Sequence, residues 1–138
     1  MESMTLSMAA AEAIQGGGEA LTAEDFRQTL HEVGVCIWSL DISTGRVSAS
    51  QTCGCLFGIP TERLTSFAAT QDLVHPDDRQ ARAHAIESVL RDGGSYEIEY
   101  RVVLPNGRGG WLRSRGQVQL DAEGRPHRHR GVVFSIEE

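Results

Sequence analysis

The sequence predicts an α+β domain in which helices pack against an antiparallel sheet of five strands. Two observations lead to this fold class. Segments with the alternating polar and apolar pattern of half-buried strands fall into two groups, two toward the N-terminus and three toward the C-terminus. Between these groups the chain carries short helical segments and one long helix pattern, so helices and strands are segregated along the sequence.

Residues 1–20 are small and polar and include the triple glycine of "QGGGE", so we expect a mobile leader there. Residues 21–33 are predicted to form an amphipathic flanking helix. Thr22 is the expected N-cap, and Asp25 three positions later completes a capping box. The folded domain is then expected over residues 34–138. The apolar side chains that share one face of the flanking helix are Phe26, Leu30 and Val33.

The first two strands are predicted at residues 36–40 and 46–50, and the Asp, Ser, Thr and Gly residues between them favour a β-hairpin. Over residues 51–73 the apolar residues come in pieces too short for a long helix, so we expect short helical turns there. Residues 78–91 carry strong helix formers and an apolar set, followed by a stop at "DGG". This segment is therefore the predicted long helix.

The last three strands follow the long helix. "SYEIEYRVV" alternates strictly, "WLRSRGQVQL" runs back after the turn "PNGRGG", and "HRHRGVVFSI" follows the turn "DAEGRP". Because each turn reverses the chain, we expect these strands to extend an antiparallel sheet.

The composition limits the class of protein. Hydrophobic residues make up 40% of the 138 residues and charged residues 23%, which is typical of one soluble globular domain. The net charge of -6 disfavours binding to nucleic acid, and the lack of lysine excludes a Schiff base. No apolar run reaches the roughly 20 residues of a membrane span, and the N-terminus lacks a cationic signal-peptide start. We therefore expect a cytoplasmic protein without a membrane partner.

The three cysteines, Cys36, Cys53 and Cys55, are an odd number in a chain without an export signal. We therefore expect reduced thiols that behave as small hydrophobic side chains, rather than a disulfide framework. Metal or redox sensing by the C-x-C pair stays open as the less favoured alternative, because a structural zinc site usually needs four ligands.

The stretch "VHPDDR" sets a histidine and two aspartates close together before the long helix. We interpret it as a helix start, in which Pro76 fits the first helical position and Asp77 or Asp78 accepts bonds from free backbone N–H groups. Gln80 would complete a capping box with Asp77, and His75 would close the turn. A catalytic or metal site is disfavoured, because adjacent side chains at a helix entrance point in different directions.

Five short motifs occur in the order and spacing of a known family. They are "GVCIWSLD" at the first strand, "FGIP" after a short helix, "VHPDDR", "YEIEYRVVLPNGRGGWL" across a hairpin and "DAEGRPHRHRGVVFSIEE" at the end. From about Val33 onward the chain resembles a PAS domain, a sensory module in which a five-stranded antiparallel sheet and a few helices enclose a ligand cavity. It is similar to the PAS fold-3 sub-type of bacterial sensor kinases and diguanylate-cyclase or phosphodiesterase proteins. The family commonly ends in an Asp-Ile-Thr signature, where this chain has Ser135, Ile136 and Glu137.

The resemblance implies a signal-transduction domain rather than an enzyme. A small ligand or a protein partner would shift the population between two packings of sheet and helices, and the change would reach an effector such as a histidine kinase or a cyclic-di-nucleotide enzyme. The resemblance also implies a homodimer, with the apolar face of the flanking helix, Phe26, Leu30 and Val33, at the outer face of the sheet. Strand parity predicts a pocket between the inner face and the long helix. Its predicted lining residues are Trp38, Phe57, Phe67, Ile86, Ile98, Tyr100, Leu112 and Val133.

Two cofactors of PAS-like proteins lack a specific motif here. A flavin adduct needs a cysteine in the helix before the long one, where "SFAATQDL" has none, although non-covalent flavin stays open. Haem ligands in the family are often histidines on the long helix, where His84 lies. Helical spacing places His84 away from Ile86 and Leu90, which favours a solvent-facing side chain over a haem ligand.

Histidine and arginine alternate along the last strand. His127 and His129 share one face and could hold a metal, but the interleaved arginines make an exposed polar edge strand the simpler interpretation. Arginines gather in the last three strands and their turns, which predicts a basic outer side. Because the sequence shows no aromatic stacking platform among them, we expect a solvated face or a docking surface for an acidic partner rather than nucleic acid. These residues are Arg101, Arg108, Arg113, Arg115, Arg125, Arg128 and Arg130.

Two other functions remain open from the sequence. A small cone-like α+β enzyme would need a histidine and an acid directed into the pocket, whereas the acids here lie mainly in turns and at outward strand positions. A ligand-free scaffold for dimerisation or docking would have a core filled by its own side chains.

Overall fold

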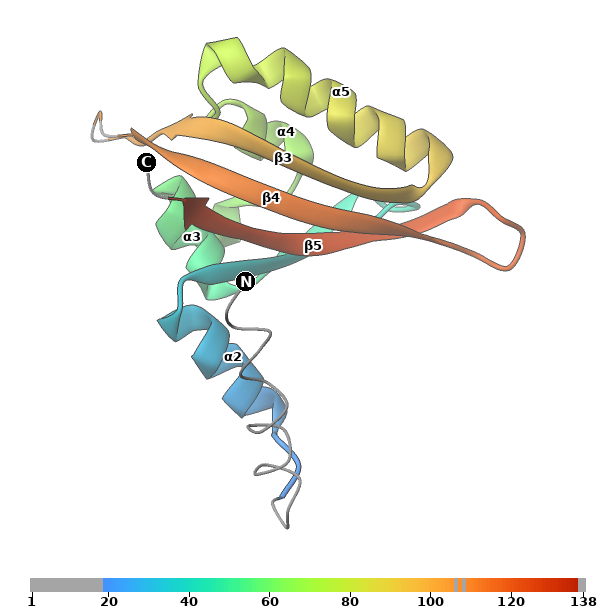
Figure 1. The fold of residues 1–138 in the computed structure, drawn as a ribbon, viewed down its shortest axis with the longest axis horizontal. Coiled ribbons are helices and arrows are strands. Elements are labelled where there is room, and N and C mark those ends of the chain that lie inside the picture. Colours follow the sequence, from blue (N-terminus) through green and yellow to red (C-terminus); the bar gives the residue numbers. More distant parts are fainter. Residues whose placement is uncertain (1–18, 106, 108, 137–138) are drawn as a thin grey trace, which may run out of the picture.

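The computed structural model describes residues 19–105, 107 and 109–136 (Figure 1). The predicted leader therefore lies outside the described residues, except for its last two positions. Helices and strands occur in the predicted order. They are α2 (Ala23–Glu32), β1 (Val35–Asp41), β2 (Arg46–Ala49), α3 (Gln51–Phe57), a 3-10 turn (Thr61–Arg63), α4 (Phe67–Gln71), α5 (Pro76–Asp92), β3 (Gly94–Val103), β4 (Gly109–Leu120) and β5 (Pro126–Ile136).

The five strands form one antiparallel sheet in the order β2-β1-β5-β4-β3, which is the predicted fold class. The last strand of the sequence, β5, is central because it pairs with β1 on one side and with β4 on the other. In Figure 1, α3 and α4 lie behind the sheet, α5 runs alongside β3, and α2 projects away from the other helices. Among the described helices, none is both long and apolar enough to span a bilayer.

Strand parity places apolar side chains on the inner face of the sheet, the side that α3 and α5 cover, as predicted. Tyr100 on β3 stands opposite Leu112 on β4, and Cys36 on β1 stands opposite Val133 on β5. These four side chains are each no more than 3% exposed. Burying a large apolar side chain stabilises the fold by about 1.5–3 kcal/mol. The complete core cluster is Cys36, Cys53, Phe57, Leu64, Val74, Tyr100, Val102, Leu112 and Val133.

The stretch before α5 is a helix start as predicted, but a different residue caps it. Pro76 is the first helical residue, and the Nδ1 atom of His75 accepts a hydrogen bond from the Asp77 backbone N–H at 3.1 Å. The expected capping by Asp77 or Asp78 with Gln80 is therefore wrong. The reason is tertiary: the His75 backbone N–H donates to a carbonyl of β3 at 2.8 Å, which helps to fix the position at which the helix begins.

Asp78 connects the start of α5 to the neighbouring strand. Its carboxylate accepts hydrogen bonds from the backbone N–H, Nε and Nη2 of Arg101 at 2.8, 2.9 and 2.8 Å. Hydrogen bonding from the Arg101 side chain holds the pKa of Asp78 below its usual value. The fold thus explains Asp78, whereas the Asp77 side chain is 77% exposed and its carboxylate lies 4.0 Å from Nδ1 of His75.

Candidate functional site

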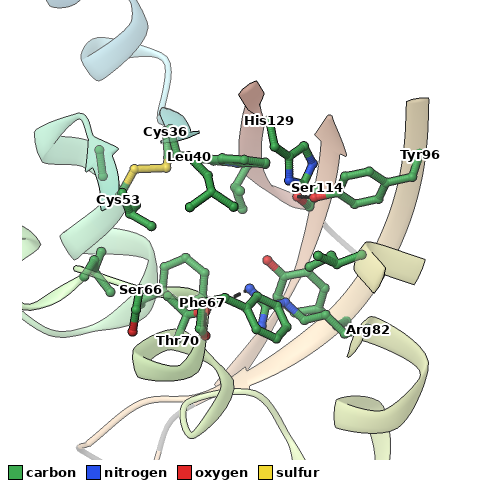
Figure 2. A pocket seen from close by; sticks show the side chains of 18 of the residues that line it. Cys36, Leu40, Cys53, Ser66, Phe67, Thr70, Arg82, Tyr96, Ser114 and His129 are labelled. Atoms are coloured by element: carbon green, nitrogen blue, oxygen red, sulfur yellow. Dashed lines mark hydrogen bonds between the residues drawn. A yellow bond between two sulfur atoms is a disulfide. The ribbon is translucent and has the colours of Figure 1, made fainter. Parts of the chain in front are cut away.

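A cavity of about 180 Å³ lies between the inner face of the sheet and helices α3, α4 and α5 (Figure 2). Six of the eight predicted pocket residues line it, namely Trp38, Phe57, Phe67, Ile86, Tyr100 and Val133. The other two do not: Leu112 lies in the core cluster, and Ile98 packs against that cluster. Sequence reasoning missed the polar part of the lining. That part consists of Ser66, Thr70, Arg82, Glu87, Tyr96, Ser114 and His129.

A glycine on β4 makes room for aromatic side chains over the centre of the sheet. Gly116 on β4 and Gly131 on β5 are register partners. A Cβ atom on Gly116 would lie only 2.6 Å from Cε1 of Tyr96 and 2.9 Å from Nε2 of His129. With glycine at this position, the His129 ring stands 4.5 Å from the Trp38 ring and 5.2 Å from the Tyr96 ring, centroid to centroid. Gly116 therefore lets Tyr96 and His129 approach this side of the cavity, and Gly131 lets the backbone of β5 lie close to that of β4.

His129 is a buried cavity residue and not part of an exposed edge strand as predicted. The expectation failed because β5 is the central strand, and alternation along one strand cannot reveal strand order. Its side chain is only 2% exposed, and its Nε2 atom has no hydrogen-bond partner among the described residues. Burial lowers the pKa of His129 to about 4, so the imidazole is neutral near pH 7. The exposed His127 does not accompany it into the cavity.

Arg82 brings a positive charge from α5 to the cavity, with only 6% of the residue exposed. Its Nη1 donates to Oε1 of Gln71 at 2.6 Å, and its Nη2 donates to Oγ1 of Thr70 at 3.0 Å. The guanidinium carbon lies 4.6 Å from the ring centroid of Phe67 and 4.8 Å from that of Tyr100. The signal was present in the sequence, because Arg82 is four residues before Ile86 and therefore on the buried side of the helix.

The two cavity tyrosines are neutral hydroxyl groups. Burial raises the pKa of Tyr96 to about 12, and burial also raises the pKa of Tyr100. The Tyr96 hydroxyl lies 3.4 Å from Oγ of Ser114. In Figure 2, Tyr96, Ser114 and His129 stand on one side of the cavity, and Phe67, Thr70 and Arg82 stand on the opposite side. The cavity therefore presents polar groups at two places on an otherwise apolar wall.

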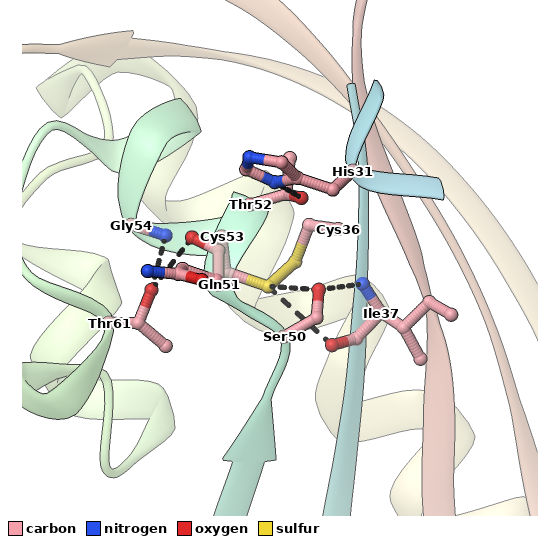
Figure 3. Close-up of a disulfide and its surroundings, with 9 residues drawn as sticks. All are labelled: His31, Cys36, Ile37, Ser50, Gln51, Thr52, Cys53, Gly54 and Thr61. Atoms are coloured by element: carbon pink, nitrogen blue, oxygen red, sulfur yellow. Dashed lines mark hydrogen bonds between the residues drawn. A yellow bond between two sulfur atoms is a disulfide. The ribbon is translucent and has the colours of Figure 1, made fainter. Parts of the chain in front are cut away.

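Cys36 and Cys53 form a disulfide that links β1 to α3 at the cavity wall (Figure 3). This corrects the expectation of three reduced thiols. The odd cysteine count excluded only the pairing of all three, whereas the fold brings the Cα atoms of Cys36 and Cys53 to 4.7 Å, within the range of a disulfide. Cys55, the other member of the C-x-C pair, is a free and exposed thiol.

The cavity does not fit haem in this conformation. Cofactors and drug-sized ligands occupy pockets of roughly 300–1,000 Å³, well above the volume of this cavity. His84 is exposed and is not among the lining residues, so it is not placed to bind an iron there. A flavin adduct also lacks its thiol, because the two sulfur atoms at the cavity are bonded to each other. The described residues contain no group of three or more metal-ligating side chains.

The outer face of the sheet, the side opposite the cavity, carries the arginines but is not the basic surface that the sequence predicts. Arg113 Nε lies 3.0 Å from Oε2 of Glu99 and 3.5 Å from Oε2 of Glu97. Arg115 also pairs with Glu97, and Arg101 pairs with Asp78. Of the other described arginines in this set, Arg125 pairs with an acid in a turn, and Arg128 and Arg130 donate hydrogen bonds to neutral polar side chains. Arg108 lies outside the described residues. Mixed charge therefore replaces the predicted basic face.

Comparison with known proteins places the chain in a family. A family model described as the PAS fold matches residues 46–133. The chain belongs to the PAS fold family. The sensor protein FixL of Bradyrhizobium diazoefficiens is 30% identical over 115 residues, which are 83% of this chain and 23% of that protein. A blue-light-activated histidine kinase of Brucella anthropi is 26% identical over 121 residues, which are 87% of this chain and 24% of that protein. This PAS domain thus spans about a quarter of the length of these curated relatives.

Solved structures show the same fold. The N-terminal domain of a diguanylate cyclase with a PAS/PAC sensor from Marinobacter aquaeolei superposes with a TM-score of 0.69 at 20% identity, over 73% of this chain and 94% of that one. A sensory box histidine kinase/response regulator from Burkholderia thailandensis gives a TM-score of 0.65 at 26% identity, over 80% and 83%. The chain is thus a sensory module of the type found in signalling proteins, and not a catalytic domain. This decides against the cone-like enzyme.

Proposed function

We propose that this PAS domain senses a small molecule in the cavity and passes the binding event to a signalling effector, such as a histidine kinase or a cyclic-di-nucleotide enzyme. The observation that carries the proposal is the position of the cavity. One wall is the inner face of the sheet, and the other is formed by three helices, so a ligand contacts both layers at once. Binding that favours one packing of these layers shifts the population of the whole domain.

A chain connection and a hydrogen bond link α2 to the cavity and could transmit a conformational change from the cavity to this helix. The helix is followed after two residues by β1, whose Cys36 and Trp38 line the cavity. His31 at the end of α2 also lies within hydrogen-bond distance of Thr52 on α3, at 2.6 Å between Nδ1 and Oγ1. Movement of β1 or α3 around a ligand would therefore reorient α2, the helix that the family resemblance implies for the dimer contact.

Exposed apolar side chains support a homodimer formed through α2. The helix begins with the predicted capping box between Thr22 and Asp25, yet it buries none of its residues in this chain. Phe26 is 54% exposed and Val33 is 66% exposed, while Leu30 is half-buried. An amphipathic helix gains stability mainly by burying its apolar face. We propose that a second copy of the chain covers this face and the adjoining outer side of the sheet.

Native mass spectrometry combined with an absorption spectrum of the purified protein tests both parts of the proposal. We expect a dimer mass, and either an added small-molecule mass or a ligand-free cavity that accepts a small molecule on titration. Phe26→Glu should shift the dimer toward monomer, whereas Gln28→Glu, which adds the same charge at an exposed polar position of α2, should not. A dimer that accepts no ligand would favour the scaffold function instead. A haem or flavin band would contradict the size argument for the cavity.

A further inference from the structure

Arg82 is a buried charge without a counter-ion in the described part of the chain. Its hydrogen-bond partners, Gln71 and Thr70, are neutral, and the two aromatic rings that it contacts are neutral as well. No carboxylate among the described residues forms an ion pair with it, and its Nε atom is buried without a hydrogen-bond partner. Buried charges in proteins are normally paired, because an unpaired ion loses its hydration without compensation.

Within the described residues, other arginines are paired with carboxylates but Arg82 is not. Arg101 and Arg113 each meet a carboxylate oxygen within 3.0 Å, although both are far more exposed to water than Arg82. Glu87 is the one acidic residue among the described residues that line the cavity. It is exposed, and no ion pair joins it to Arg82. Among the described residues, the cavity therefore offers Arg82 no paired carboxylate.

A carboxylate is the group that a guanidinium in this position recognises best. The guanidinium presents five N–H donors in a planar fork that matches the two oxygens of a carboxylate. Contacts with the Phe67 and Tyr100 rings and hydrogen bonds to Gln71 and Thr70 already hold the guanidinium in place, so little freedom is lost when an anion binds. The neutral His129 and the Tyr96 hydroxyl on the other side add polar groups without adding charge.

The remaining walls and the volume define the rest of the ligand. Trp38, Phe57, Ile86 and Val133 present apolar surface to the cavity. An engineered apolar cavity of about 150 Å³ in another protein binds benzene, and the cavity here has about 180 Å³. A single ring or a branched chain of similar size fits, with room for one small polar group.

We infer that the ligand of this PAS domain is a small organic carboxylate with a compact apolar body, and that Arg82 binds its carboxylate inside the cavity. The inference rests on the proposed ligand-sensing function and names the chemical class of the ligand. The apolar body occupies the space between Trp38 and Ile86, and the carboxylate neutralises the charge that the fold leaves unpaired.

Matched pairs of probes test the inference on the unmodified chain. Benzoate and benzamide, or phenylacetate and phenylacetamide, have nearly the same shape and differ in charge. Titrations followed by NMR can observe the Nε–H group of Arg82 directly. We expect each carboxylate to bind roughly 10- to 100-fold more tightly than its amide, because hydrogen bonds to a buried charged group are the strong ones. The Arg82 Nε–H resonance should move on addition of benzoate.

Three variants test whether benzoate binding depends on the charge of Arg82 rather than on the stability of the fold. Arg82→Gln should reduce the affinity for benzoate to that for benzamide, Arg82→Lys should retain part of the preference, and Arg91→Gln should have no effect. Arg91 is the matched control because it lies on the same helix and its side chain is 68% exposed. Because the comparison of benzoate with benzamide needs no substitution, the test remains decisive if a variant at Arg82 fails to fold.

The outcomes distinguish this inference from the proposed function. If benzamide binds as tightly as benzoate, or if Arg82→Gln leaves benzoate binding unchanged, the carboxylate assignment is wrong while ligand sensing stands. If none of the four probes binds at millimolar concentration and the purified protein carries no small molecule, both the inference and the proposed function are wrong.

Discussion

On the outer face of the sheet Arg113 lies between the carboxylates of Glu97 and Glu99, whereas on the inner side the groups that Arg82 meets among the described residues are all neutral. The outer pairs are in contact with water, where an ion pair costs little to form and contributes little to stability. The inner charge is almost fully removed from water, where an unpaired ion is costly. The described residues thus pair arginines that are exposed to water, where an ion pair adds little stability. They leave the buried Arg82 without a carboxylate, which a ligand in the cavity can supply.

The largest expected effect comes from placing the same charge on each face. Leu112→Asp puts a carboxylate at a side chain that is 3% exposed in the core cluster, and it should unfold the domain. Ile37→Asp changes an apolar side chain on the outer face that is 40% exposed, and the fold should survive. Circular dichroism and one-dimensional NMR measure the folded population. A folded Leu112→Asp variant would show that the inner face is assigned wrongly.

The disulfide at the cavity wall gives the next largest effect. Cys36 and Cys53 are separated by 17 positions, and a loop of about that length stabilises a fold by about 3 kcal/mol when it is closed. Cys36→Ser should therefore lower the free energy of unfolding under non-reducing conditions by that order, and reduction should bring the wild type to the same value.

Cys55→Ser is the control for the disulfide, because Cys55 is free and exposed on the same helix as Cys53. It should leave the melting temperature unchanged with or without reductant. Mass spectrometry after alkylation counts the free thiols before reduction. If all three cysteines react at once, the two thiols lie together without being bonded, and the predicted loss in Cys36→Ser would then come from packing alone.

The buried His129 is expected to have a smaller effect, which makes the free energy of unfolding depend on pH. Burial lowers its pKa from 6.5 to about 4, so between these values the unfolded chain binds a proton that the folded chain does not. The free energy of unfolding should therefore fall as the pH drops from about 6.5 to about 4. Denaturant titrations across this range should show the fall in the wild type and in His127→Gln, and a flatter profile in His129→Gln.

The contributions of His129 and of the Asp78 ion pair to stability change in different pH ranges. The pKa of Asp78 lies below its ordinary value of 3.8, so the stability that Asp78 contributes is present above that pH and is lost only as the pH falls further. A profile in His129→Gln that still falls between pH 6.5 and 4 would assign the loss to another group and contradict a neutral buried imidazole.

Local patterns predicted the fold well because each element carries its own signals. The capping box at Thr22 and Asp25 and the alternation through Tyr96 and Tyr100 depend only on neighbours in the sequence, and both features occur in the structure. Six of the eight predicted residues line the cavity, and strand parity accounts for the three that lie on strands, Trp38, Tyr100 and Val133. What failed depended on tertiary position. Strand order decided that His129 is buried, and the approach of α3 to β1 decided that Cys36 is bonded.

Arg82 was not among the predicted cavity residues for a different reason. Its spacing of four residues from Ile86, which places it on the buried side of the helix, was visible in the sequence. Charged residues are rarely fully buried, so an arginine on the apolar stripe of a helix was not counted as part of the pocket. Residues that break the expected pattern without a partner in the chain are expected at functional sites. The unpaired arginine is therefore informative for the same reason that sequence reasoning overlooked it.

The smallest expected effect is on the outer face and completes the comparison. Arg113→Gln removes the arginine between Glu97 and Glu99, but all three side chains are 38–48% exposed and Arg115 remains close to Glu97. The melting temperature should change by no more than about 2 °C, and the change should shrink at high salt, because exposed ion pairs are weak and screened. Thermal unfolding at low and high salt measures both quantities. A large loss in melting temperature that salt does not reduce would show that the pairing of Arg113 with Glu97 and Glu99 contributes strongly to stability. The contrast between the two faces would then rest only on the lack of a carboxylate partner for Arg82 among the described residues.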